Sequence, residues 1–351
     1  MEVKGTVVLI TGASSGIGAA AALAFDRAGA RVAVAARRAE RLEKLVERMA
    51  DALAVPTDLT DPAATAAMVD STVRRFGGID VLINNAAIIA MAPGDRTRPD
   101  DVRRCLETNF IGPMVATNQA VKHMRRRGGG HIINIGSPAA VLGVPFLGPY
   151  TASKAALSGW TRSIQAEWEG TGIVVSEYLP GNVATGAQAE SELGVIGGDV
   201  FEDPNQHPLT RALARPQRAE KIAADLVDLV RRPRPVMYSS PGVRLGLWLT
   251  IFSPLRRALG TKMATAVRRR LGLSVFSDRV PAADTAAKDE AKPRSATNGK
   301  RKGAGRKTKS ADSGTKTGAS TTRSTHASRK ESAAKPRRRK ASQTPNDDRP
   351  V

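Results

Sequence analysis

VVLITGASSGIG, residues 7–18, is the stretch of sequence that decides the fold of this chain. Its first four residues are β-formers, its glycines stand at positions 12, 16 and 18, and an alanine-rich helical pattern then runs to Ala28 and stops at Gly29. A glycine-rich turn between a strand and a helix lets the backbone approach a pyrophosphate, which the free N–H groups of the helix N-terminus attract. The turn supplies six candidate phosphate-binding residues: Gly12, Ser14, Ser15, Gly16, Ile17 and Gly18.

The same strand-and-helix rhythm continues along most of the chain. Short runs of apolar residues at about 7–10, 32–35, 53–55, 81–83, 131–135, 173–178 and 236–238 predict strands. Helical patterns occur at about 17–28, 40–49, 62–75, 99–107, 110–126, 153–169 and 218–230. This alternation predicts an α/β fold, a doubly wound parallel sheet with helices on both faces. Residues 182–215 interrupt the rhythm and predict a loop with one or two short helices.

The excess positive charge is concentrated at the C-terminus of the 351-residue chain. Residues 1–280 carry 35 Lys and Arg against 26 Asp and Glu, whereas residues 281–351 carry 19 against 7. The last segment has too few apolar residues to offset the entropy of ordering it. We therefore expect a catalytic domain at 1–240, an apolar and basic amphipathic extension at 241–280, and a disordered basic tail at 281–351.

The extension and the tail each allow two interpretations. Within 243–271 an apolar stretch bordered by arginines is followed by apolar residues at helical spacing beside further arginines, which favours either peripheral membrane contact or packing over the substrate loop or against a second subunit. Clusters of Lys and Arg at 300–302, 306–307 and 337–340 are typical of non-specific polyanion binding, and equally of a solubilising appendage.

Several classes of protein are disfavoured by the composition. Cys105 is the single cysteine, so no internal disulfide can form, and we expect it to be a small buried side chain on a helix. The four histidines are scattered without ligand spacing, so no metal site is predicted. The N-terminus lacks a secretory signal pattern, and no apolar run reaches the roughly 20 residues of a membrane span. We expect a cytoplasmic protein, with membrane association as the alternative.

Two arginines follow the second predicted strand. An NAD site usually places an acid here for the ribose 2′-hydroxyl, but this chain has Ala36 followed by Arg37 and Arg38. A guanidinium group matches a 2′-phosphate with paired donors, so the segment favours NADP(H) over NAD(H). The alternative is a solvated basic helix start.

The third and fourth predicted strands end in further candidates for cofactor contact. Asp58 and Leu59 follow the third strand, where a carboxylate can accept from an adenine amino group. Asp58 can instead serve the turn before the next helix, for which Asp61 is the better cap. Asn85 and Ala86 follow the fourth strand, where small residues leave room for a cofactor sugar and Asn side chains can tie neighbouring strands together.

The reactive group is predicted around Tyr150 and Lys154, which lie one helical turn apart on the same face. A nearby ammonium lowers the pKa of a phenol, as acid–base work near neutral pH requires. Ser137 ends the fifth strand and can donate to a substrate oxygen, while Asn109 can hold a water that links Lys154 to solvent. A chance pair of surface residues and an ordinary turn serine are the alternative. The order of all these residues along the chain favours a hydride-transfer site.

Together these motifs resemble the short-chain dehydrogenase/reductase family over roughly residues 3–240. The resemblance implies a Rossmann fold and NAD(P)-dependent oxidoreduction of an alcohol/carbonyl pair. It gives Tyr150 the role of acid/base, Lys154 the tuning and ribose contact, Ser137 the substrate hydrogen bond and Asn109 the proton relay. It also implies a cofactor-binding segment beside the nicotinamide, made by Pro180, Gly181, Val183 and Thr185, and a homo-oligomer. Ala87, where the family usually has glycine, is a departure.

The substrate region is predicted to be apolar. Its candidate residues are Val141, Leu142, Val144, Phe146, Leu193, Val195 and Ile196. They favour a small hydrophobic carbonyl or alcohol, although the same residues can simply pack a loop. The function predicted from the sequence is therefore an NADP-dependent oxidoreductase. The alternative is a non-catalytic NADP-binding module that engages a membrane or a polyanion through its C-terminus.

Overall fold

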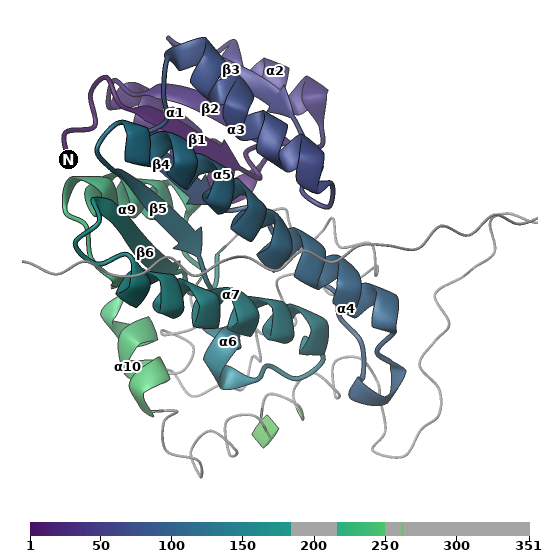
Figure 1. Ribbon diagram of the computed structural model, residues 1–351. Helices are drawn as coiled ribbons and strands as arrows, with labels where there is room; N and C mark the ends of the chain where they lie inside the picture. The colour runs from purple at the N-terminus through teal and green to yellow at the C-terminus, as the bar shows by residue number, and fades with distance from the viewer. Residues whose placement is uncertain (184–215, 250–260, 263–264, 266–351) are drawn as a thin grey trace, which may run out of the picture. The chain divides into compact units, whose positions relative to one another are not determined.

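The computed structural model describes residues 1–183, 216–249, 261–262 and 265 (Figure 1). Several predictions fall on residues outside these ranges. They are the cofactor contact of Thr185, the apolar residues Leu193, Val195 and Ile196, most of the amphipathic extension, and the basic tail.

The described part of the chain contains one parallel sheet of seven strands in the order β3-β2-β1-β4-β5-β6-β7. The strands are β1 (Val7–Thr11), β2 (Arg31–Ala36), β3 (Ala52–Pro56), β4 (Val81–Asn84), β5 (Gly130–Ile135), β6 (Ile173–Leu179) and β7 (Val236–Tyr238). The chain builds outward from β1 to β3, then crosses back and builds the other half from β4. The order of the strands reverses between β1 and β4, where open α/β sheets bind ligands at the carboxyl ends of their strands.

Helices cover both faces of the sheet, as the sequence predicted (Figure 1). One face packs against α1 (Gly16–Arg27), α2 (Ala39–Val46) and α9 (Ala219–Arg231). The other packs against α3 (Pro62–Phe76), α5 (Gly112–Arg126) and α7 (Gly148–Glu167). Val8 and Ile10 of β1 face the first group, whereas Val7 and Leu9 face the second. Burial on both sides explains why the central strands read as continuous apolar runs.

The predicted start of α3 is confirmed. The Asp61 side chain accepts from the backbone N–H groups of Ala63 at 2.8 Å and Ala64 at 3.1 Å, and Pro62 occupies the first turn. Such a cap contributes about 1 kcal/mol to helix stability. Gly77 ends the helix in the left-handed conformation, with φ of 79°.

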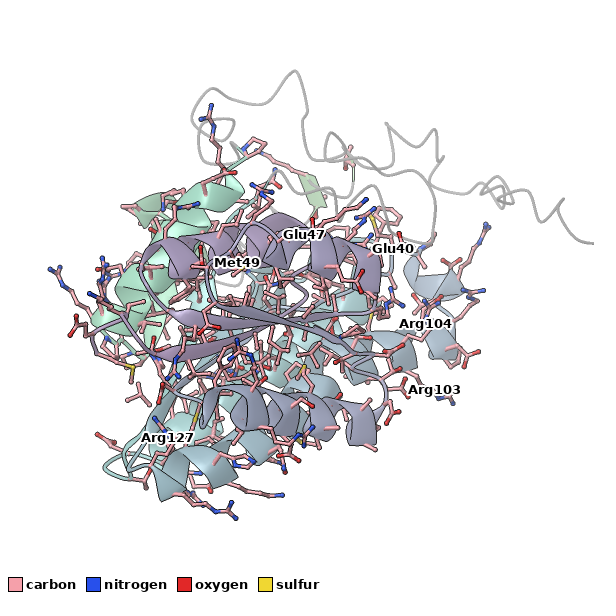
Figure 2. The ribbon with its side chains drawn as sticks, turned by 90° about the horizontal axis from the view of Figure 1, so that it is seen from above. Glu40, Glu47, Met49, Arg103, Arg104 and Arg127 are labelled. Atoms are coloured by element: carbon pink, nitrogen blue, oxygen red, sulfur yellow. The ribbon has the colours of Figure 1, made fainter. Side chains whose placement is uncertain are left out.

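The region between residues 99 and 126 differs from the two separate helices that the sequence predicted. α4 (Pro99–Leu106) runs through a π-helical turn, η2 (Glu107–Ile111), directly into α5. Pro113 lacks the N–H that would pair with the carbonyl of Asn109 in a regular α-helix, so the turn widens instead of breaking. Figure 2 shows Arg103 and Arg104 of α4 pointing outward, whereas the next residue, Cys105, is buried as predicted.

The remaining short helices are η1 (Gly94–Arg96), α6 (Ala139–Leu142) and α10 (Pro241–Leu249).

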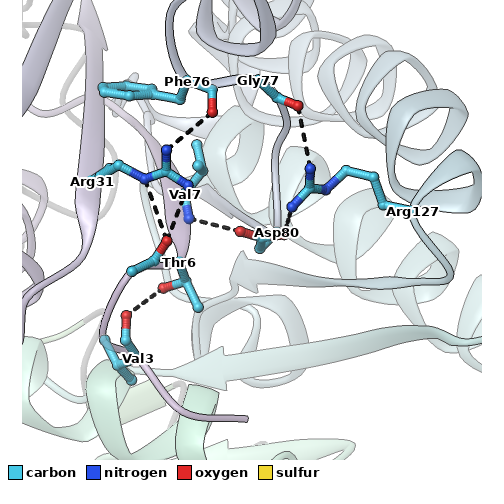
Figure 3. A network of polar contacts seen from close by, with 9 residues as sticks. Val3, Thr6, Val7, Arg31, Phe76, Gly77, Asp80 and Arg127 are labelled. Atoms are coloured by element: carbon cyan, nitrogen blue, oxygen red, sulfur yellow. Dashed lines mark hydrogen bonds and ion pairs between the residues drawn. The ribbon is translucent and has the colours of Figure 1, made fainter.

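The amino-terminal edge of the sheet is closed by a network of polar contacts (Figure 3). Asp80, which precedes β4, accepts from the Val7 N–H at 2.8 Å and pairs with Arg127 at 3.4 Å. Arg31 of β2 donates to the Gly5 carbonyl at 3.1 Å. Because these contacts hold the strands together at this edge, the carboxyl edge is the one left for a site.

Candidate functional site

The glycine-rich turn after β1 depends on glycine at three positions. Gly12 and Gly16 have φ of 68° and 56°, the left-handed region that favours glycine. A Cβ on Gly12 would stand 2.6 Å from the Cα of Ala86, and one on Gly18 would stand 2.5 Å from the Gly12 carbonyl oxygen. The turn is therefore packed backbone to backbone, as a phosphate cradle requires.

Asn85 and Thr11 fix this turn to the end of β4. The Asn85 Nδ2 donates to the Thr11 carbonyl at 2.8 Å, and the Thr11 Oγ1 accepts from the N–H groups of Asn85 at 3.0 Å and Ala86 at 3.1 Å. The two predicted cofactor residues after β4 thus hold the turn in shape.

The N-terminus of α1 fits an anionic group. Its first residue follows Ser15, whose backbone is extended and whose side chain makes no capping bond to the described part of the chain. The first turn of α1 contains no acidic residue. The backbone N–H groups and the positive end of the helix are therefore available to a pyrophosphate.

Arg38, at the start of α2, reaches the glycine-rich turn. Its Nη2 donates to the Ser14 Oγ at 2.9 Å and to the Ser15 Oγ at 3.3 Å. Arg37 is exposed at the end of β2. One of the two predicted arginines thus lies directly beside the turn.

Asp58 and Leu59 lie at the carboxyl end of β3. The Asp58 Oδ1 accepts from the N–H and the hydroxyl of Thr60 at 3.0 and 2.9 Å, so this carboxylate also serves the local turn. Leu59 is buried, and its side chain lies against Gly112 of α5. The cofactor contact of both residues stays a prediction.

Tyr150, Lys154 and Ser137 come together where β5 and α7 meet. The Lys154 side chain is 2 % exposed, and its Nζ donates to the Ile135 carbonyl at 2.8 Å. The same Nζ lies 6.0 Å from the centroid of the Tyr150 ring. Ser137 is buried two residues beyond Ile135, and its Oγ accepts from the Ala139 N–H at 3.2 Å.

Burial dominates the proton affinities of this group. It raises the pKa of Tyr150 above its ordinary value, and interaction with the Ser137 hydroxyl lowers this pKa only in part. Burial also lowers the pKa of Lys154 to about 8, while the charge of Glu177 acts in the opposite direction. The lowering of the Tyr150 pKa that the sequence predicted from Lys154 is not found in the protein alone, because burial is the largest influence on this pKa and raises it.

Asn109 is fully buried in the π-helical turn. Its Oδ1 accepts from the Ile88 N–H at 2.8 Å, and its Nδ2 donates to the Ile88 carbonyl at 2.9 Å. It also donates to the Ser153 Oγ at 2.9 Å, and Ser153 in turn donates to the Tyr150 carbonyl at 2.7 Å. The side chain therefore holds the turn against the start of α7. The predicted proton relay through Asn109 stays a prediction.

The segment after β6 is described as far as Val183. It begins at Pro180, which is buried. The Gly181 N–H donates to the Ser239 Oγ at 2.7 Å, and Val183 forms a bridge with Gln217. This brings the predicted segment to the carboxyl edge of the sheet; its contact with a nicotinamide stays a prediction.

Sequence reasoning missed the polar ladder beneath the site. The Asn84 Nδ2 donates to the Asn134 Oδ1 at 2.8 Å and to the Thr117 Oγ1 at 3.0 Å, and the Asn134 Nδ2 donates to the Thr161 Oγ1 at 2.8 Å. The signal was an asparagine inside each of two apolar strands. It led only to the expectation that asparagines tie strands, which Asn84 and Asn134 confirm.

Sequence reasoning also missed Glu177, a buried carboxylate in β6. A charged residue in the middle of the run Ile173–Leu179 was the available signal.

The described residues contain no group of three His, Cys, Asp or Glu side chains able to hold a metal ion. No helix among them combines the length and the apolar character that crossing a membrane requires.

Known proteins share both this sequence pattern and this fold. Residues 6–194 match the short chain dehydrogenase family. The chain belongs to that family. A relative, the dehydrogenase/reductase SDR family member 7B of Bos taurus, is 32% identical over 264 residues, which is 72% of this chain and 79% of the bovine protein. As a short-chain dehydrogenase the chain is placed among the oxidoreductases.

Solved structures of short-chain dehydrogenases superpose on this chain. One from Burkholderia phymatum in complex with NAD gives a TM-score of 0.63 at 25% identity and covers 71% of this chain and 94% of its own. Another from Burkholderia cenocepacia J2315 in complex with NADP gives 0.60 at 29% identity, with 70% and 100% covered. They confirm the doubly wound parallel sheet for this short-chain dehydrogenase.

Proposed function

We propose that this protein is an NADP(H)-dependent oxidoreductase that interconverts a hydrophobic carbonyl compound and its alcohol. The observation that carries the proposal is that Tyr150, Lys154 and Ser137 come together at the end of β5, at the same edge of the sheet as the glycine-rich turn that follows β1. Lys154 is buried there with its ammonium bonded to a main-chain carbonyl rather than to solvent. A binding module has no need of a buried ammonium beside a tyrosine side chain.

The residues divide the chemistry among themselves. A bound nicotinamide dinucleotide supplies or accepts the hydride. Tyr150 donates its proton to the substrate oxygen during reduction and takes it back during oxidation. Ser137 donates a hydrogen bond to the same oxygen, where negative charge gathers. Lys154 places a positive charge near the phenol and holds the cofactor ribose.

The preference for NADP(H) rests on Arg38. Its guanidinium lies within hydrogen-bonding distance of both serines of the turn, at the end of β2 where the adenosine ribose of a dinucleotide binds. A 2′-phosphate there accepts paired donors from a guanidinium. Short-chain dehydrogenase structures with NAD and with NADP are both similar to this chain, so a nicotinamide dinucleotide is the supported class of cofactor.

A hydrophobic substrate is supported by the segment between β5 and α7. Val141 on α6 is exposed, and Phe146 adopts a φ of 65° while its carbonyl accepts from the Ala92 N–H at 2.9 Å. A bulky residue in this region of φ is strained, and such strain is concentrated at functional sites. The apolar segment ends at Leu147, one turn before the phenol of Tyr150.

A panel assay tests the proposed function. The full chain is incubated with NADPH and a series of hydrophobic ketones and aldehydes, and loss of NADPH is followed together with formation of the alcohol. We expect turnover of at least one carbonyl compound, with stoichiometric alcohol. Tight NADPH binding without oxidation by any compound of the panel, and without reduction of NADP by the matching alcohols, would contradict the proposal.

A second candidate function, contact of the C-terminal extension with a membrane surface, is favoured by α10. Leu245 and Trp248 of this helix are 53% and 57% exposed. Exposed apolar side chains beside arginines are typical of interfacial helices. Sedimentation of the full chain with anionic vesicles, compared with the double variant Leu245→Ser and Trp248→Ser, tests this. Equal recovery of the original protein and the double variant in the supernatant would contradict membrane contact through α10.

We also expect the protein to form a homo-oligomer. Light scattering should give the same mass for the original protein and the double variant.

A further inference from the structure

Glu177 is a buried carboxylate on the α7 side of the sheet. Its side chain is 3 % exposed. Ile173 and Val175, four and two residues earlier in β6, pack in the core under α7, whereas Tyr178 packs in the core of the opposite face. Because side chains alternate along a strand, Glu177 shares the face of Ile173 and Val175 and points toward α7.

The neighbouring strand makes room for this carboxylate. A Cβ on Gly136, the residue directly after β5, would stand 2.6 Å from the Glu177 Oε1, so a side chain at position 136 would collide with it. Gly136 directly precedes Ser137 and directly follows Ile135, whose carbonyl holds the Lys154 ammonium. The carboxylate therefore lies next to the segment that holds Lys154 and Ser137.

One oxygen of the carboxylate lacks a partner. The Glu177 Oε1 is buried, and it has no hydrogen bond to any atom of the described residues. Burying a carboxylate oxygen unpaired costs stability, and packing alone does not offset that cost.

The charged groups that face Glu177 come from α7. Burial raises the pKa of Glu177, and a hydrogen bond from Ser158 together with the charges of Arg162 and Lys154 lowers it in part. Ser158 lies between Lys154 and Arg162 on the same helix face. Arg162, at the solvent end of this row, donates to the Ser158 Oγ at 2.9 Å. In the sheet Glu177 pairs with Asn134 of β5 and Val236 of β7, and Gly136, just after β5, lies beside its carboxylate. None of these three residues has a titratable side chain. Tyr150 and Cys105 face Lys154 from the other side.

We propose that Glu177 is a positioning residue for Lys154. Its carboxylate, held through Ser158 and Arg162, is the buried counter-charge that keeps the Lys154 ammonium protonated and seated on the Ile135 carbonyl beside Tyr150. The inference rests on the proposed function, because it assigns Glu177 to the Lys154 of that site. A lysine this deeply buried without a nearby negative charge loses its proton readily.

Charge removal without change of shape gives the first test. Glu177→Gln keeps the volume and the Ser158 bond, Glu177→Asp keeps the charge, and Glu169→Gln removes an exposed carboxylate beyond the end of α7 as control. The full-length proteins are compared by NADPH oxidation as a function of pH. We expect the alkaline limb of Glu177→Gln to move down by roughly one pH unit. Glu177→Asp should restore at least half of that shift, and Glu169→Gln should match the original protein. Superimposable profiles for Glu177→Gln and the original protein would overturn the inference.

A second readout does not depend on activity. Lys154 has a folded pKa of about 8, below its ordinary value of 10.5, so the unfolded chain binds more protons between these values and stability rises with pH there. Glu177→Gln should start this rise at a lower pH in thermal unfolding, whereas a purely structural Glu177 would leave its onset unchanged.

The two tests separate the inference from the proposed function. If the rise in stability starts at a lower pH in Glu177→Gln, but the protein reduces none of the tested carbonyl compounds, the role of Glu177 is sustained and the oxidoreductase is contradicted. If the original protein turns over a carbonyl compound, and Glu177→Gln shifts neither the onset of the stability rise nor the pH profile of the rate, the oxidoreductase is sustained and the role of Glu177 is overturned.

Discussion

The ammonium of Lys154 donates to the main-chain carbonyl of Ile135 at 2.8 Å and so joins α7 to the end of β5. Ser137 lies two residues beyond Ile135, just after the end of β5, and Tyr150 lies one turn before Lys154 on α7. The bond therefore helps to fix the position of the serine hydroxyl after the strand relative to the phenol on the helix. The geometry of the reactive group depends on a contact between two elements that are separated in sequence.

Replacing Lys154 should lower both activity and stability. In Lys154→Met an aliphatic chain of similar length remains, but the Ile135 carbonyl and the buried Glu177 carboxylate lose a partner, so the free energy of unfolding should fall. NADPH oxidation should fall about 100-fold or more, the scale of acid–base contributions. Thermal unfolding and turnover measured on the same preparation check both parts. Lys122→Met, on the exposed side of α5, is the matched control and should keep full turnover.

The pH dependence of reduction should follow Lys154 rather than Tyr150. The pKa of Lys154 is lowered to about 8, so its positive charge is lost as pH rises through that value. The pKa of Tyr150 is raised by burial, so the phenol keeps its proton over the same range. The rate of carbonyl reduction per unit of enzyme should decline above about pH 8. A rate that stays level well beyond this pH in steady-state kinetics would show that the Lys154 charge is not needed.

The glycine-rich turn should tolerate no added methyl at Gly18. In Gly18→Ala the new Cβ would meet the Gly12 carbonyl at 2.5 Å and the Asn85 Nδ2 at 2.7 Å, so the turn must shift. We expect at least a 10-fold loss of NADPH affinity by fluorescence titration. Gly159→Ala, on α7 with open space around it, is the control and should bind normally while gaining up to about 1 kcal/mol of stability.

Arg38 should decide between the two dinucleotides. Arg38→Ala removes the guanidinium beside Ser14 and Ser15, and with it the paired donors for a 2′-phosphate. Affinity for NADPH should fall roughly 10- to 100-fold while affinity for NADH changes little, on the scale of one or two charge-assisted bonds. Arg48→Ala, exposed near the end of the helix that follows β2, serves as control. Equal losses for both cofactors would remove Arg38 from the 2′-phosphate site.

The polar ladder should support the fold rather than the chemistry. Asn134→Ala leaves Asn84 and Thr161 without their partner inside the sheet, which should lower the free energy of unfolding by about 2–3 kcal/mol. Asn118→Ala, exposed on α5, should cost less than about 0.5 kcal/mol. Denaturant titration of the two variants measures the difference. A similar small change in both would show that the ladder contributes little.

The sequence predicted the parts of this structure that depend on local chemistry. Continuous apolar strands predicted the parallel sheet, Asp61 and Pro62 predicted the start of α3, and Gly12 and Gly18 predicted the turn, because each effect acts within a few residues. Family resemblance then brought Asn109, Ser137, Tyr150 and Lys154 together, which spacing alone does not establish.

The rest depends on contacts between distant segments. The π-helical turn at Asn109 arises where Pro113 meets a helix already packed on α7, and neither fact is visible in a single helical pattern. The Tyr150 pKa is raised, whereas the pairing with Lys154 had indicated a lowered one, because desolvation depends on every neighbouring element. From the sequence, Glu177 is only a polar residue in a strand, because its burial against Gly136 and α7 depends on the three-dimensional structure.

The most direct measurement of the central claim compares Tyr150→Phe with Tyr238→Phe in the NADPH oxidation assay, after both have been shown to bind NADPH. Phenylalanine keeps the ring and removes the proton that Tyr150 is expected to deliver. The account predicts that Tyr150→Phe loses at least about 100-fold in turnover with unchanged NADPH affinity, while Tyr238→Phe on β7 keeps its rate. Turnover by Tyr150→Phe equal to that of Tyr238→Phe would contradict it.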